Sequence, residues 1–109
     1  MLNYSYAQRL KENGFPQKEL KYSWYYTNEG EIHNTGKNPF HSSLGTYCPR
    51  FEEIMEDLEK NFGGIDFFSL KGKYQGKWFI TVKLKGKKAI RAEGNIQNVV
   101  LAEIWLKLA

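Results

Sequence analysis

The chain has 109 residues, 41% hydrophobic and 26% charged, with 7 Phe, 7 Tyr and 3 Trp that can anchor a core. This composition excludes intrinsic disorder as the main state, and the length is too short for two average domains. The net charge is +4, no apolar run approaches the roughly 20 residues that span a bilayer, and the N-terminus lacks a signal-peptide pattern. We therefore expect one intracellular domain over residues 1–109, without membrane contact.

The first elements are a helix and a strand. Ser5 and Gln8 have capping-box spacing, which predicts a helix over residues 5–13 that Gly14 ends. Apolar and aromatic side chains then alternate with others over residues 20–26, and this period of two predicts a strand.

A turn and a long loop follow. Residues 28–30 turn the chain toward a short second strand around Ile32. Residues 33–46 are rich in Asn, Thr, Gly, Pro and Ser, so we expect a long surface loop pinned by Phe40 and Leu44.

Pro49 marks the start of an amphipathic helix that ends at the glycine pair 63–64. Its apolar face consists of Phe51, Ile54, Met55, Leu58 and Phe62. The opposite, acidic face carries Glu52, Glu53, Glu56, Asp57 and Glu59.

Three strands and a helix complete the chain. Strands are predicted over residues 65–70, 77–85 and 88–92, as an antiparallel meander. In the second of these the inward side chains are Trp78, Ile80, Val82 and Leu84. Asn95 is expected to cap the last helix, whose apolar face includes Ile96, Val99, Val100, Leu101, Ile104, Trp105 and Leu108. The predicted class is α+β, with one antiparallel sheet of four to five strands, about three helices and the order α-β-(β)-α-β-β-β-α.

Four segments resemble those of small proteins encoded by phages, prophages and other mobile elements. They are residues 10–17 (LKENGFPQ), Tyr25-Tyr26, Tyr47-Cys48-Pro49 and residues 101–108 (LAEIWLKL). The resemblance implies a phage or prophage origin, a place in the bacterial host's cytoplasm, and membership among the accessory proteins that block bacterial defences, anti-CRISPR proteins included. Many of these proteins are nonenzymatic binders, so a host protein or ribonucleoprotein complex is the implied partner.

Positive charge is concentrated in one part of the chain. Residues 67–92 carry eight basic side chains and no acidic one, whereas the remaining 8 basic residues stand against all 12 acids, a balance of −4. Such asymmetry indicates an electrostatic partner more strongly than the net charge does.

The basic meander is therefore the predicted binding surface. Alternation turns Lys77, Lys83 and Lys85 outward together with Phe79, and a ring among cations suits phosphates and stacked bases. The scarcity of arginine argues against base-specific reading. The candidate residues, including one outward aromatic of the first strand, are Lys71, Lys73, Lys77, Phe79, Lys83, Lys85, Lys87, Lys88, Arg91 and Tyr25.

Other interpretations of these lysines stay open. Lysines protect edge strands from aggregation, and Phe79 could lie under a helix. The same surface could meet an acidic protein, or the acidic helix of a second copy in a homodimer. A further alternative is a nucleotide-sequestering pocket lined by Trp24, Tyr26 or Arg91.

Catalytic and metal-binding patterns are weak. The glycines do not form a phosphate loop between a strand and a helix. Cys48 could act as a nucleophile only with His33 or His41 beside it, and these three residues match no zinc-ligand spacing. A cation on the acidic helix face is also weakly indicated, because such faces are usually solvated. We expect no enzyme activity, no cofactor and no metal.

Overall fold

The structure, a computed structural model, describes the backbone of residues 1–109 and every side chain except those of Lys73 and Tyr74. The chain forms two compact units, Met1–Pro49 and Arg50–Ala109. The expectation of a single domain over residues 1–109 stays a prediction.

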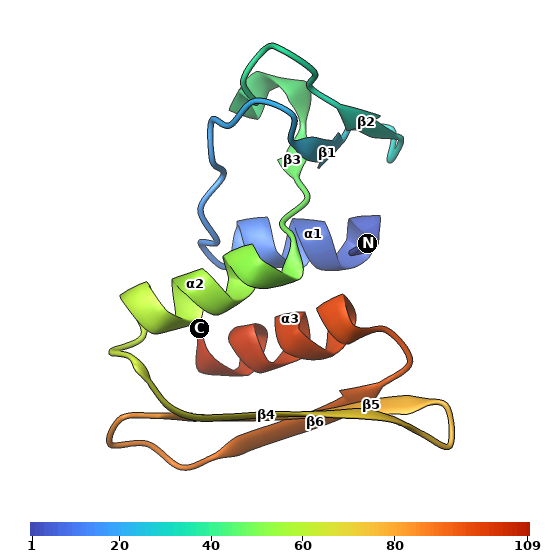
Figure 1. The fold of residues 1–109 in the computed structure, drawn as a ribbon. Coiled ribbons are helices and arrows are strands. Elements are labelled where there is room, and N and C mark those ends of the chain that lie inside the picture. The colour runs from blue at the N-terminus through green and yellow to red at the C-terminus, as the bar shows by residue number, and fades with distance from the viewer. The chain divides into compact units, whose positions relative to one another are not determined.

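The first unit combines one α-helix with a small antiparallel sheet (Figure 1). Its helix is α1 (Tyr4–Glu12), and its strands are β1 (Trp24–Tyr26), β2 (Ile32–Asn34) and β3 (Thr46–Tyr47), in the order β2-β1-β3. A short 3-10 helix, Ser42–Leu44, lies before β3. The sequence predicted α1, β1 and β2 but not β3, because two residues are too few to show alternation.

The N-cap of α1 differs from the prediction. Asn3, not Ser5, caps the helix, since the Asn3 side-chain oxygen accepts a hydrogen bond from the Tyr6 N–H at 3.0 Å. An Asn at this position satisfies one of the free N–H groups of the first turn.

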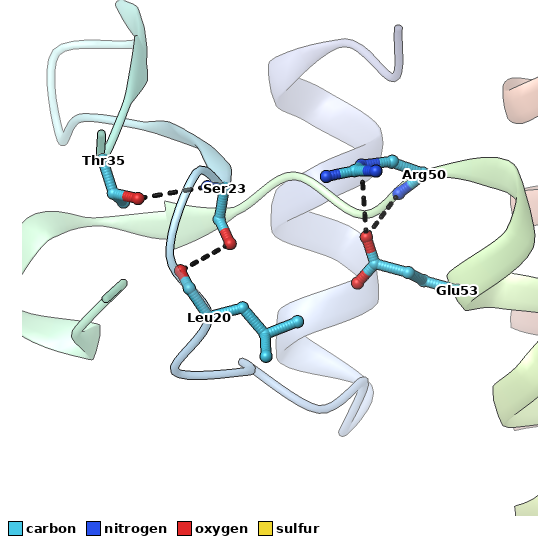
Figure 2. A network of polar contacts seen from close by, with 5 residues as sticks. All are labelled: Leu20, Ser23, Thr35, Arg50 and Glu53. Carbon is cyan, nitrogen blue, oxygen red and sulfur yellow. Dashed lines mark hydrogen bonds and ion pairs between the residues drawn. The ribbon is translucent and has the colours of Figure 1, made fainter. Parts of the chain in front are cut away.

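The first strand is shorter than the alternation of residues 20–26 suggested. Tyr22 has a φ of 57°, in the left-handed region, and the strand begins only at Trp24. The bend before it is held by Ser23, whose N–H donates to the Thr35 hydroxyl at 3.1 Å and whose own hydroxyl donates to the Leu20 carbonyl at 2.7 Å (Figure 2). Leu20 and Tyr22 are consequently exposed rather than part of a sheet face.

The long segment between β2 and β3 is fixed by one of the two residues predicted to pin it. Phe40 is buried, with its ring centroid 5.4 Å from that of Tyr47, whereas Leu44 is 41% exposed. The remaining apolar core of this unit consists of Leu2, Ala7, Leu10, Phe15 and Cys48.

The second unit has the order helix, three strands, helix. It contains α2 (Phe51–Asn61), β4 (Ile65–Tyr74), β5 (Lys77–Leu84), β6 (Ile90–Gly94) and α3 (Gln97–Leu108). Its antiparallel sheet has the order β4-β5-β6. The α+β class and the three α-helices are confirmed, but the single sheet of four to five strands is wrong: the strands form two three-stranded sheets.

One face of the β4-β5-β6 sheet contributes side chains to the hydrophobic core of the second unit. Ile80, Val82 and Leu84 are at most 1% exposed, and α3 contacts both β5 and β6. The approach is close at Gly94, where an added Cβ would lie 3.0 Å from Cγ2 of Val100 in α3. Glycine at this position avoids a contact tighter than most Cβ atoms make.

Asp57 departs from the predicted acidic face of α2. It is 6% exposed and accepts hydrogen bonds from the indole N–H of Trp105, at 2.7 Å, and from the Asn61 side chain. The ring of Phe62 meets that of Trp105 edge-on at 5.7 Å. A carboxylate that looks like part of a solvated face therefore links α2 to α3.

The N-termini of the two helices in this unit are capped differently. At α2 the Arg50 N–H donates to the Glu53 carboxylate at 3.3 Å, and the Arg50 guanidinium lies 3.9 Å from the same oxygen (Figure 2). At α3 the N-cap is Ile96, with no side-chain cap, rather than the predicted Asn95. Ile96 is 49% exposed and does not join the apolar face expected for it.

Candidate binding face

Three of the predicted lysines, Lys71, Lys77 and Lys83, lie on the sheet face opposite Ile80, Val82 and Leu84, which we call the outer face. Lys85, predicted to lie in the strand, falls just beyond its end. In Figure 1 both helices of the second unit lie on the other side of this sheet. The pairing Lys71↔Phe79, Ser69↔Thr81 and Thr81↔Arg91 places side chains from three strands in neighbouring rows. The outer face consists of Phe67, Ser69, Lys71, Lys77, Phe79, Thr81, Lys83, Arg91 and Glu93.

The alternation of β5 is confirmed. Ile80, Val82 and Leu84 are buried, while Lys77 is exposed and Phe79, Thr81 and Lys83 are half-buried. Because β5 is the central strand, its lysines do not serve as protection for a sheet edge.

Two of the predicted cations are partly neutralised within the molecule. Lys83 Nζ lies 3.0 Å from the Asp66 carboxylate, and Lys77 Nζ lies 3.6 Å from that of Glu93. Both acids stand one residue outside the acid-free segment 67–92, so the sequence count missed them. Exposed pairs of this kind are worth about 0–1 kcal/mol and are readily exchanged for another partner.

Lys71, Phe79 and Arg91 line a small pocket on the outer face, with a volume of about 100 Å3. Phe79 is half-buried and lies opposite Lys71 on β4 and opposite Glu93 on β6, while Arg91 is one row away, opposite Thr81. The Arg91 Nε–H donates to the Thr81 hydroxyl at 3.4 Å, which holds the guanidinium beside the ring. The sequence put these residues in one surface but gave no sign of the pocket, because it depends on the pairing of three strands.

Further cations continue into the turn between β5 and β6. Lys85, Lys87 and Lys88 are exposed there, and among the described residues none of them forms an ion pair. The side chain of Lys73, also a candidate, lies outside the described residues.

An exposed phenylalanine on the outer face was not among the predicted site residues. Phe67 is 53% exposed and lies opposite Lys83. The apolar run of residues 65–70 predicts a strand, but it does not alternate clearly enough to assign the Phe67 ring to one side of the sheet.

Tyr25, the candidate of the first unit, is half-buried in β1. Its ring stacks on that of His33 at 5.9 Å and tilts against that of Phe40 at 5.8 Å. The most exposed ring of this strand belongs instead to Trp24, at 38%.

The first unit also has an open depression of about 370 Å3, lined by Gln8, Lys11, Glu12, Asn28 and Thr46. Lys11 Nζ donates across it to the Gly45 carbonyl at 3.2 Å. Its lining is polar and its one cation is already bonded to the backbone, so nothing in it selects a ligand class.

The cysteine and the histidines have structural contacts. Cys48 is 3% exposed and its thiol donates to the Leu2 carbonyl at 3.5 Å. His33 contacts Glu31 at 3.3 Å, and His41 contacts Ser43 at 2.7 Å. Across the described residues, no three His, Cys, Asp or Glu side chains are grouped so that they could hold a metal ion.

No protein-family model, no curated protein and no solved structure matches this chain. None of the helices in the described part of the chain has the length and apolar character needed to cross a membrane.

Proposed function

We propose that this chain is a nonenzymatic phage or mobile-element accessory protein that binds and inhibits a host macromolecule. The target class is a bacterial defence complex such as a CRISPR effector, in the cytoplasm of the host. The outer face is the binding surface.

The observation that carries this proposal is the composition of the outer face. One side of the β4-β5-β6 sheet is used by the core, while the other side presents Phe67, at 53% exposure, and Phe79 among cations. Exposed aromatic side chains surrounded by charged ones are typical of surfaces that become buried when a partner binds. The buried thiol of Cys48 supports a binding role over nucleophilic catalysis.

The binding surface is tested by comparing Phe67→Glu with Leu20→Glu in affinity capture from a bacterial host that expresses its defence systems. Both residues are exposed to a similar degree, 53% and 48%, so neither change should unfold the chain. We expect the wild type and Leu20→Glu to recover the same partner and Phe67→Glu to lose it. Equal recovery of the partner by both variants would exclude the outer face as the binding surface.

Inhibition is tested separately. Expression of the protein in a bacterium with an active CRISPR system should restore plating of a phage that the system targets, and the Phe67→Glu variant should not. Full restriction in the presence of stable wild-type protein, across several defence types, would reject the inhibitory role.

The alternatives predict other outcomes. A homodimer would show twice the monomer mass in solution, lost in Phe67→Glu. A nucleotide-sequestering protein would bind mononucleotides as tightly as longer strands. The pocket beside Arg91 supports this second alternative.

A further inference from the structure

We infer that the pocket lined by Lys71, Phe79 and Arg91 binds one nucleotide unit of a single-stranded nucleic acid, with the base on Phe79 and the phosphate on the two cations. This inference rests on the proposed function, since it assigns a partner class to the outer face.

The chemistry of the pocket matches a nucleotide. Phe79 offers a ring face, and Lys71 lies directly opposite it on β4. On β6 the residue opposite Phe79 is Glu93, which pairs with Lys77, and Arg91 lines the pocket from the diagonal position opposite Thr81. Adjacent strands are about 4.8 Å apart, so a phosphate attached to a base on Phe79 is within reach of either side chain. The guanidinium can hold two phosphate oxygens, whereas the ammonium acts as a point charge.

The partner is a single strand because the ring lies within the sheet, between β4 and β6. A base can stack there only if its own face is free. Bases in a duplex already stack on one another, whereas single strands expose them to aromatic side chains. A pocket of about 100 Å3 also suits one phosphate with the edge of one base rather than a groove of a double helix.

The partner is a strand rather than a free nucleotide because the unpaired cations continue beyond the pocket. Lys88 is three residues from Arg91, about 10 Å of extended chain, and Lys85 and Lys87 lie in the same turn. These side chains form no ion pair among the described residues, so they are available to further phosphates.

Base stacking is tested by anisotropy titration with a labelled oligothymidylate of about 12 nucleotides, within the site sizes of single-strand binding modules. Phe79→Leu should weaken binding about 5- to 150-fold, the range for loss of one stacked base. The matched control is Tyr22→Leu, which removes an exposed ring of the first unit, outside the outer face, and should leave the affinity unchanged. With an abasic oligomer of equal length, Phe79→Leu and the wild type should bind equally.

The phosphate path is tested by salt dependence. Each phosphate contact of a single strand contributes a slope of about 0.7 to log K against log salt, so Lys87→Gln with Lys88→Gln should reduce the slope by about 1.4. Lys21→Gln with Lys37→Gln removes the same charge from exposed positions of the first unit and should leave the slope unchanged.

Three results would overturn the inference. The first is equal affinity for a duplex of the same length. The second is displacement of the oligomer by polyglutamate at the same charge concentration, which would favour an acidic protein partner. The third is unchanged affinity in Arg91→Gln, a variant that is needed because Phe79 is half-buried and its replacement could disturb the fold, whereas Arg91 is exposed. If oligomer binding fails while Phe67→Glu still loses its captured partner, the inference fails and the proposed function stands.

Discussion

Asp57 has a structural role that its place in the sequence does not indicate. It occupies a position in an acidic run, yet its carboxylate accepts from the Trp105 indole at 2.7 Å inside the second unit. A buried donor left without its acceptor costs about 1–3 kcal/mol, and hydrogen bonds to charged groups are at the upper end of the usual range.

We therefore predict that Asp57→Ala lowers the free energy of unfolding by about 2–3 kcal/mol, measured by urea denaturation. Glu56→Ala on the exposed side of the same helix removes its 2.6 Å ion pair with Lys60 and should cost about 0.5 kcal/mol. Equal losses in the two variants would show that Asp57 contributes no more than a surface charge.

Tyr26 contributes to the pH dependence of the first unit. Its hydroxyl donates to the Leu2 carbonyl at 2.6 Å, and burial, followed by repulsion from Cys48, raises the pKa of Tyr26 above 10.0. Since the folded-state pKa is the higher one, this contribution to stability is complete below pH 10 and is lost as pH rises through the raised pKa.

The expected result is that the free energy of unfolding falls less steeply above pH 10 in Tyr26→Phe than in the wild type. At neutral pH the variant should be about 1 kcal/mol less stable, because it lacks the hydrogen bond. Tyr22→Phe at a 57% exposed position is the control and should follow the wild-type curve. Parallel alkaline curves for all three proteins would contradict the prediction.

At the scale of elements, β3 depends on Gly45, which has a φ of 146°. A Cβ at this position would overlap the carbonyl oxygen of Tyr26 in the neighbouring strand. We predict that Gly45→Ala costs about 3 kcal/mol, through strain and loss of the β1–β3 pairing.

The control for Gly45→Ala is Gly36→Ala. Gly36 has a φ of 64° but open space around the added Cβ, so its cost should be about 1 kcal/mol, from backbone conformation alone. Thermal unfolding of the two variants measures the difference, and equal midpoints would show that β3 tolerates the added atom.

The elements also show what the sequence could predict. β5 alternates strictly over eight residues, so its inward and outward sides were predicted correctly. Residues 20–26 alternate too, but hydrophobic periodicity does not reveal the left-handed Tyr22 or the bonds of Ser23 that end the extended chain.

The candidate site was predictable only in part, because strand periodicity can be seen in the sequence and strand pairing cannot. The outward lysines follow from the period of a strand, whereas the pocket at Phe79 requires the register of three strands. The ion pairs of Asp66 and Glu93 bring together residues 17 and 16 positions from their lysines, a separation that local patterns do not resolve.

At the scale of the whole molecule, the two compact units raise the question of how they fold. Among its described side chains, the second unit contains ten buried apolar ones within its own helices and strands: Ile54, Leu58, Ile80, Val82, Leu84, Val100, Leu101, Ala102, Ile104 and Trp105. We predict that a fragment of residues 50–109 unfolds cooperatively on heating, as many domains of about 60 residues do.

Circular dichroism of this fragment decides between two descriptions of the chain. A sigmoidal transition would make the units separate folding domains. A fragment without a transition would instead support one domain over residues 1–109, as the sequence predicts. Residues 1–49 are expected to be marginal alone, because a chain of that length buries too little surface.

The irregular pairing of β4 has a consequence for how copies of this chain behave at high concentration. β4 is the long outer strand of its sheet, and its register with β5 shifts both between Ile65 and Phe67 and between Lys71 and Tyr74. A strand distorted near each end is a poor template for continuous backbone pairing with a neighbour. The exposed Phe67 therefore lies on an edge strand that is poorly suited to strand addition by a second copy.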